Sequence, residues 1–460
     1  MKKALATILA LVMALGLTTM AWADNVAKID GTGYATLEAA IEHVADGETI
    51  VMQQDVTLTN ALKIKKTGEA FTIDLGKKTL TGRVNIMSGT VTITNGKVVG
   101  DQPLNVYGSA TSAANFSVLN IENDVVVNGK GDDKNSAVIF DCLNEAGENS
   151  NVGYGAVINI SGTVYGTVFV SGNLGNDGHY SDEMRNSNII NVKNGAVIYT
   201  TMDQGIAMNG AAVVNIENGA SVTGREAVGV KRGALNVNGG TLTAVGNKVD
   251  PVEGNTNGTE KSGAAISVTN TYNGHGNITV NVNGGTITST NNDAIYKGVT
   301  TGENFTTAPT FGVTGGTFSS DVSAYTAGDT PVAFNERTKE RTYYYVGAET
   351  IQNAAKNLSA GQWLAIGKGT VRLTDVPAGV IVRPEHDTVV FVNGKDISNE
   401  LDGYTVPQSS GYYYYQPTTD TKTTDTKGSP QTFDAGIALY VGMALTSAAG
   451  VAFVGKKRED

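Results

Sequence analysis

The 460-residue sequence predicts an all-β protein whose main part is a parallel β-helix, a solenoid of stacked coils. Short segments with apolar residues at positions i and i+2 recur through the middle of the chain, as in half-buried strands. Each segment is followed by paired Asn, Asp or Gly residues, which turn the chain readily. With 57 Gly residues and only 17% charged residues, the composition excludes collagen, a coiled coil and a charge-rich disordered tail.

The strand-and-turn motif recurs seven times. The copies are VTITNGKVV at 91–99, LNIENDVVV at 119–127, INVKNGAVI at 190–198, VNIENGASV at 214–222, LNVNGGTLT at 235–243, VNVNGGTIT at 280–288 and FGVTGGTFS at 311–319. The next inward residue is expected five positions after the second apolar one in six copies. In the copy that contains Ile216, it is expected six positions later, at Val222.

Two arrangements explain these copies. Asn-Gly between alternating runs is a strong hairpin signal, so each copy could be an antiparallel hairpin. The copies are unevenly spaced, however, and single strands are expected between them at 137–140, 156–160 and 264–268. This favours stacked coils, because loops of any length can leave such a stack.

A solenoid also needs covered ends. A helix is predicted at about 36–45, with Leu37, Ala40, Ile41 and Val44 on one face. The segment at 350–366 aligns with the one at 36–52. A smaller, second β-rich unit with its own cap is therefore expected over residues 326–417, after a β-helix over residues 24–325.

The N-terminal segment is typical of a secretory signal peptide over residues 1–23. Lys2 and Lys3 precede an apolar run at 4–17 and an A-x-A cleavage site. Cleavage is expected between Ala23 and Asp24, which would place the mature chain outside the cytoplasm.

The C-terminal segment predicts a surface anchor. Residues 435–454 are an uncharged run of 20 residues, long enough for a transmembrane helix, and the basic residues at 456–458 would stay in the cytoplasm. A Thr/Asp/Lys spacer at 418–428 is followed by Ser429, Pro430, Gln431, Thr432 and Phe433.

The segment 429–460 resembles the sorting signal of Gram-positive cell-wall proteins. In that family a sortase cleaves Leu-Pro-x-Thr-Gly after the Thr and joins the Thr to a peptidoglycan precursor. Pro430 and Thr432 match this motif, whereas Ser429 and Phe433 replace its Leu and Gly. The alternative is a plain C-terminal membrane anchor with a chance Pro-x-Thr.

The repeats resemble bacterial surface β-helix proteins of the pectin-lyase-like superfamily over about residues 30–325. This resemblance implies a right-handed parallel β-helix. It also implies a Val and Ile interior and hydrogen-bonded ladders of stacked turn asparagines.

Some members of that superfamily degrade polysaccharides. The polygalacturonase-like enzymes use Asn-Thr-Asp, Asp-Asp, Gly-His-Gly and Arg-x-Lys motifs. Asp132-Asp133 and Gly274-His275-Gly276 occur here in that order, but no Asn-Thr-Asp precedes them, and the first Arg after His275, Arg337, lies in no such motif.

A lyase would need clustered Asp residues for Ca²⁺ and a Lys or Arg base that faces the same groove. The mid-chain candidates Arg225, Glu226, Lys231 and Arg232 are expected on a charged outer surface. No catalytic residue is therefore predicted.

No cofactor or metal site is predicted either. Cys142 is the only cysteine and is expected to be a buried small hydrophobe. The histidines are far apart in sequence: His43, His179, His275 and His386. The net charge of −11 and the lack of an internal basic cluster argue against a nucleic-acid partner.

Exposed tyrosines are the remaining candidates for recognition. Tyr343–Tyr345 and Tyr412–Tyr415 flank the second unit and could contact sugar rings or a host protein. The alternative is that they pack at the edges of that unit.

These features predict a non-enzymatic, adhesin-like surface protein, attached covalently to a Gram-positive cell wall and held by the membrane before processing. Its expected partners are a sortase, a peptidoglycan precursor, and a glycan or a host or matrix protein. The alternative function is a secreted polysaccharide lyase or glycoside hydrolase.

Overall fold

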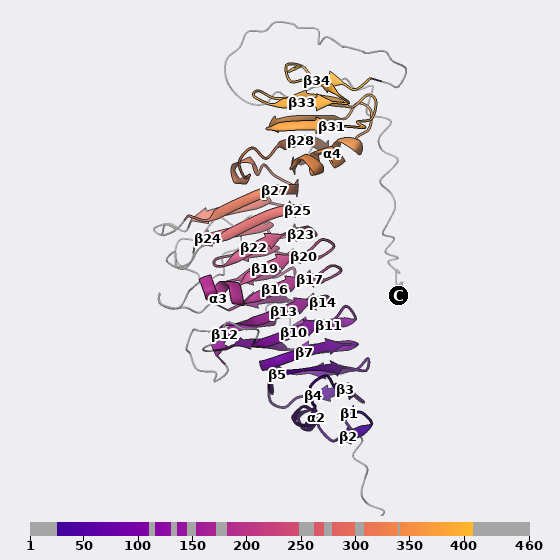
Figure 1. Ribbon diagram of the computed structural model, residues 1–460, viewed down its shortest axis with the longest axis vertical. Coiled ribbons are helices and arrows are strands. Elements are labelled where there is room, and N and C mark those ends of the chain that lie inside the picture. The colour runs from indigo at the N-terminus through magenta and orange to yellow at the C-terminus, as the bar shows by residue number, and fades with distance from the viewer. Residues whose placement is uncertain are drawn as a thin grey trace, which may run out of the picture. The chain divides into compact units, whose positions relative to one another are not determined.

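Parallel coils stacked on one another make up most of the computed structural model (Figure 1). The structure describes residues 25–109, 116–129, 136–144, 153–171, 182–247, 262–270, 278–299, 308–338 and 341–407. Contacts divide the chain into two units, Met1–Tyr415 and Gln416–Asp460, and every described residue belongs to the first. The predicted all-β architecture with parallel strands is confirmed.

The strands of the coils line three faces. Face I contains β3 (Thr49–Met52), β10 (Ser117–Ile121), β13 (Ala156–Ile160), β16 (Ile189–Val192), β19 (Val213–Ile216) and β22 (Ala234–Val237). Face II contains β4 (Val56–Thr57), β6 (Thr79–Thr81), β8 (Gly96–Gly100), β11 (Val125–Gly129), β14 (Thr163–Tyr165), β17 (Val197–Tyr199), β20 (Ser221–Gly224) and β23 (Thr241–Ala244).

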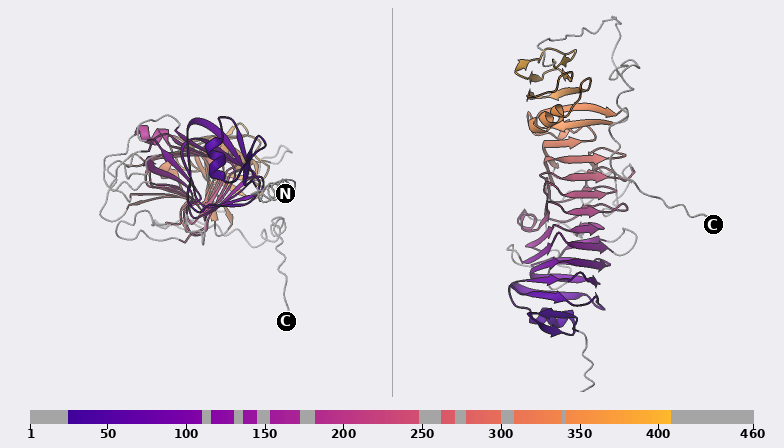
Figure 2. Two further views of the ribbon diagram at one scale, coloured as in Figure 1. Left: turned by 90° about the horizontal axis from the view of Figure 1, so that it is seen from below. Right: turned by 90° about the vertical axis from the view of Figure 1, so that its right-hand side faces the viewer.

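Face III contains β9 (Leu104–Gly108), β12 (Ser136–Asn144), β15 (Thr167–Val170), β18 (Ile206–Met208), β21 (Val228–Val230), β24 (Ile266–Asn270) and β26 (Ile295–Val299). Four longer strands turn a corner and serve two faces: β5 (Leu62–Asp74), β7 (Val84–Thr94), β25 (Thr279–Ser289) and β27 (Thr310–Phe318). A short helix, α3 (Asp182–Ser187), precedes β16. The view along the stack in Figure 2 shows the coils lying over one another.

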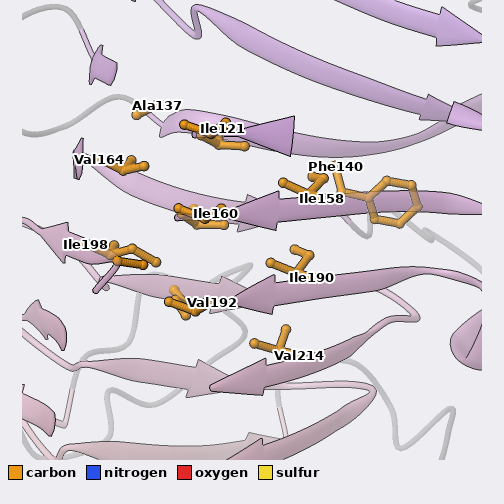
Figure 3. Close-up of a cluster of buried hydrophobic side chains, with 14 of the residues drawn as sticks. Ile121, Ala137, Phe140, Ile158, Ile160, Val164, Ile190, Val192, Ile198 and Val214 are labelled. Atoms are coloured by element: carbon orange, nitrogen blue, oxygen red, sulfur yellow. The ribbon is translucent and has the colours of Figure 1, made fainter. Parts of the chain in front are cut away.

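The interior is filled by columns of apolar side chains. Ile158, Ile190 and Val214 stack from coil to coil in β13, β16 and β19 (Figure 3), each at most 1% exposed. The inward pairs expected from the alternation, such as Val280 and Val282, are fully buried. Burial of each such side chain stabilises the fold by roughly 1.5–3 kcal/mol.

The hairpin interpretation of the repeat is wrong. The copy at 190–198 contains two strands on different faces, of which β16 pairs in parallel with β13 and β19, whereas β17 pairs with β14 and β20. The turn in each copy is therefore a corner between two faces.

Two corners are longer than predicted. In these two copies the next inward residue, Val127 or Ile198, comes six positions after the second apolar residue of the motif, as Val222 does in its copy. All three side chains are fully buried. The additional residue in two of these corners is a small buried one, Ala196 or Ala220.

The asparagine ladder lies elsewhere than predicted. Outward-facing asparagines in the middle of the face I strands bond side chain to side chain. From Asn159 onward, each amide Nδ2 donates to the asparagine Oδ1 of the preceding coil at 2.8–2.9 Å. The members, hereafter the asparagine ladder, are Asn120, Asn159, Asn191, Asn215, Asn236 and Asn281. Among the turn asparagines, Asn283 donates to Asn238 (2.9 Å).

The ladder has defined ends. Asn120 Nδ2 donates to Thr92 Oγ1 (3.0 Å) at one end. At the other end Gly312 is paired with Asn281 on the next coil, and a Cβ at Gly312 would lie 2.8 Å from Asn281 Oδ1. A ladder bond joins residues 21 apart in one coil and 45 apart in another, so the register is kept despite unequal coil lengths.

A hairpin and a helix begin the solenoid. β1 (Ala27–Ile29) pairs antiparallel with β2 (Thr32–Tyr34) and with β3. The predicted helix is present as α2 (Leu37–His43), and Thr36 Oγ1 accepts a hydrogen bond from Ala39 N–H (3.1 Å) at its start. The expected apolar face is buried at Leu37, Ala40, Ile41 and Val44.

The same order of elements recurs near the end of the described chain. A hairpin of β28 (Val332–Thr338) and β29 (Arg341–Val346) precedes α4 (Ala348–Lys356), and short parallel coils follow. The remaining elements are η1 (Ser323–Tyr325), β30 (Trp363–Lys368), β31 (Thr370–Leu373), β32 (Ile381–Pro384), β33 (Val389–Val392), β34 (Lys395–Asp396) and β35 (Tyr404–Thr405). Buried side chains of this segment form a hydrophobic cluster of their own, from Ala333 to Val406.

Several predicted features lie outside the described residues. They are the signal peptide with Ala23 and Asp24, the spacer, the sorting residues Ser429–Phe433, the transmembrane segment 435–454, and the Asp132-Asp133 and Gly274–Gly276 motifs. The burial of the Cys142 side chain is likewise not described. Within the part of the chain that the structure describes, no helix is long and apolar enough to cross a membrane.

Candidate binding face

The outer surface of face II presents two columns of side chains that run from coil to coil. Alternation in each strand turns one residue inward and the next outward. The strand registers place the outward residues of the first column in the order Thr163, Val197, Ser221, Thr241, Thr286 and Thr317. The second column is Asn128, Tyr165, Tyr199, Thr223, Thr243 and Thr288.

An exposed aromatic pair stands in the second column. Tyr165 and Tyr199 are 47% and 42% exposed, and they face outward on adjacent coils because Val164 and Ile198 face inward. Their ring centroids are 6.2 Å apart at an interplanar angle of 75°. An edge-to-face pair of this kind presents a ring surface and phenolic hydroxyls together to solvent.

The rest of this surface is hydroxyl-rich and carries no charge. From the coil of Tyr165 onward, both columns contain only Thr, Ser, Val and Tyr. Arg225 lies one position beyond the end of β20 and is half-buried, and the registers place Lys97 of β8 in the first column, two coils before Thr163. The chain as a whole carries −11, so this strip differs from its average surface.

The predicted tyrosine cluster at 343–345 is half-buried at Tyr343 and Tyr344 and buried at Tyr345. Tyr345 is 2% exposed and its hydroxyl donates to Asn335 Oδ1 (2.9 Å). Tyr344 lies 5.8 Å from the ring of Phe334, and burial raises the pKa of its phenol, with a smaller contribution from the charge of Asp321. Packing, rather than recognition, thus explains Tyr344 and Tyr345. The cluster at 412–415 lies outside the described residues.

The charged outer surface predicted around residue 230 is not observed. Glu226, Lys231 and Arg232 are 0%, 4% and 2% exposed. They lie in and beside the turns that flank β21, on the side of face III. The sequence pattern could not show this burial, because it depends on how neighbouring coils stack.

The Glu226 carboxylate joins three successive coils. Gln204 Nε2 on the preceding coil donates to Oε2 (2.6 Å), and the amide and hydroxyl of Ser262 on the following coil donate to Oε1 (2.5 and 2.7 Å). Burial raises the pKa of Glu226, and these hydrogen bonds offset part of that rise. Each carboxylate oxygen is bonded within the protein, so the group serves as a structural link between coils.

The burial of Glu226 makes stability depend on pH. The folded carboxyl has a pKa above the ordinary 4.5, so the stabilisation is complete below that pH and is lost as pH rises through the folded value. Glu226→Gln removes this titration. We expect wild type to lose stability relative to the variant as pH rises above 4.5, by at most about 1.4 kcal/mol per pH unit. Chemical denaturation of both proteins from pH 4 to 8 measures the difference, and parallel curves would contradict the assignment.

Among the described residues no group of three or more His, Cys, Asp or Glu side chains could hold a metal ion. His43 Nδ1–H donates to the carbonyl oxygen of Ala39 (2.8 Å) at the end of α2, and its ring centroid lies 5.4 Å from that of Tyr34.

Sequence reasoning missed the Tyr165–Tyr199 pair. The signal was present, because each tyrosine directly follows an inward strand residue in the segments TVY and VIY. What the sequence could not supply was the register that stacks these two strands as neighbours.

Comparison of the chain with protein-family models, with curated proteins and with solved structures found no match.

Proposed function

We propose that this chain is a non-enzymatic, adhesin-like surface protein that binds a glycan or a host or matrix protein through the outer surface of face II. The observation that carries the proposal is the exposed Tyr165–Tyr199 pair on an uncharged surface. Two adjoining exposed tyrosine rings are a candidate contact site, because Tyr is enriched where binding energy concentrates.

The stacked coils support the rest of the interpretation. Parallel strands with a Val and Ile interior agree with a right-handed, pectin-lyase-like β-helix. Each coil adds one more row to the same outer surface, so a solenoid suits the display of a repeated binding surface away from the cell.

A binding array tests this function. The full chain and a Tyr165→Ala/Tyr199→Ala variant are applied to immobilised glycans and matrix proteins. We expect at least one ligand to bind wild type and to lose binding to the variant, because removal of both rings deletes the exposed contact area. Equal binding of the two proteins to every ligand would place the function on another surface.

Anchoring to the cell wall is the second part of the proposal. It is supported by the sequence order of Pro430, Thr432, an apolar span and a basic tail. In a host with the cognate sortase, muramidase should release the protein as a ladder of wall fragments, and Thr432→Ala should abolish that ladder. Extraction of wild type by detergent alone would indicate a plain membrane anchor.

A second candidate function is a secreted polysaccharide lyase or glycoside hydrolase. The order of Asp132-Asp133 and Gly274-His275-Gly276 in the sequence supports it. Glu226 is 0% exposed and both of its oxygens accept hydrogen bonds within the protein, which indicates a structural role for this carboxyl. Robust release of reducing ends or unsaturated products, lost in Glu226→Gln, Asp133→Asn or His275→Ala, would replace the binding proposal.

A further inference from the structure

We infer that the ligand of face II is an uncharged polysaccharide whose chain lies along the column of Tyr165 and Tyr199, parallel to the stacking direction of the coils. This inference rests on the proposed function and names its ligand class and orientation. Three properties of the surface lead to it.

The first property is the absence of charge. Both columns are uncharged from the Tyr165 coil to the Thr288 coil. A uronate, sulfated or sialylated ligand would lie over a strip without a single cation, on a protein of net charge −11, and would gain no favourable electrostatic contact there. Hydroxyls that both donate and accept suit the hydroxyls of a neutral sugar.

The second property is that the backbone hydrogen-bonding groups of face II are already paired between coils. β17 pairs with strands on both sides, β14 and β20, and β20 pairs in turn with β23. The backbone amides of these strands are therefore used within the stack, and a peptide cannot add itself to them as a further strand. Thr and Ser fill most of the remaining surface, and they are poor anchors for a protein partner.

The third property is the direction of the column. Tyr165, Tyr199 and Thr223 follow one another on adjacent coils, and Thr243 and Thr288 continue the row. Neighbouring strands are about 4.8 Å apart, so the row offers a contact at regular short steps. A linear chain that lies along it meets the aromatic pair first and then successive hydroxyls.

The aromatic pair gives this row its strongest contact. Because the rings of Tyr165 and Tyr199 are inclined at 75°, one ring face can cover the C–H surface of a sugar while the other ring directs its hydroxyl toward the same sugar. The adjoining threonines then add hydrogen bonds that depend on chain length.

A length series tests the inference. Gluco-, manno- and galacto-oligosaccharides of two to eight units are titrated into the full chain by calorimetry, with polygalacturonate and fibronectin as the charged and protein probes. We expect one neutral series to bind, with affinity that rises with chain length. Tyr165→Ala/Tyr199→Ala should weaken the longest member about tenfold or more.

Two further variants separate the possible outcomes. Thr243→Glu should weaken the longest oligosaccharide and leave the shortest unchanged, whereas Tyr165→Phe/Tyr199→Phe, which keeps the rings, should retain most of the affinity. Binding of polygalacturonate alone, lost in Arg225→Ala, or binding of fibronectin alone, would overturn the ligand class and leave a binding function in place. Binding of all ligands that is indifferent to every face II variant would overturn both proposals.

Discussion

Val282→Asp is expected to lower the free energy of unfolding by about 4 kcal/mol or more. Val282 is fully buried in β25, where its strand pairs with β22 on one side and β27 on the other. An aspartate there has no described charged partner and would have to lose its hydration inside an apolar column. Urea denaturation followed by circular dichroism measures the change.

Thr288→Asp is the matched control. It lies in the same strand, but it faces outward from face II and is half-buried. A carboxylate at this position stays in contact with water, so we expect a loss within about 0.5 kcal/mol. If both variants unfold at the same denaturant concentration, the inward and outward assignments of β25 are wrong.

Asn215→Ala is expected to cost about 2 kcal/mol. Asn215 lies inside the asparagine ladder, where it donates to Asn191 Oδ1 (2.9 Å) and accepts from Asn236 Nδ2 (2.9 Å). The substitution removes both hydrogen bonds, and each is worth about 1 kcal/mol net. Thermal unfolding and urea denaturation of the variant measure the cost.

The end of the ladder supplies the control for this prediction. Asn281 donates to Asn236 (2.9 Å), and Gly312 on the next coil has no side chain to bond to it. Asn281→Ala therefore removes one ladder bond, and we expect about half the loss seen for Asn215→Ala. Equal losses at the two positions would show that the ladder bonds do not carry the stabilisation.

The inward residues were predictable because strand alternation has a period of two. The two-residue spacing of Val280 and Val282, and of Ile190 and Val192, predicts that each pair points to the same side of its strand. All four side chains are buried in the structure, as this spacing predicts. The cap helix was predictable for a similar reason, since Leu37, Ala40 and Ile41 share one helical face. Local periodicity was sufficient in both cases.

Contacts between coils were not predictable, because they depend on register. Asparagines recur in the motif both at the turns and in the middle of the strands, and the turn asparagines were predicted to form the ladder. The corners vary in length, whereas the strand pairing aligns the mid-strand asparagines, such as Asn191 and Asn215, on successive coils from β10 to β25. Only the aligned set can form a continuous ladder.

The candidate site depended on register even more. The hydrogen-bond donors to Glu226 are Gln204 and Ser262, which are 22 and 36 residues away along the chain. The surroundings of this carboxyl could therefore not be predicted from the sequence. Tyr165 and Tyr199 become a pair only when β14 and β17 are neighbours. The residue types were visible, but their juxtaposition was not.

The central claim is that face II carries the binding site, and a comparison of dissociation constants tests it most directly. The best ligand from the array is titrated into wild type, into Tyr165→Ala/Tyr199→Ala, and into Val389→Ala/Leu401→Ala, which removes two similarly exposed side chains (41% and 46%) near the end of the described chain. We predict a loss of about tenfold or more for the tyrosine variant and an unchanged affinity for the control. Equal affinity for wild type and the tyrosine variant, with both melting at the same temperature, would contradict the claim.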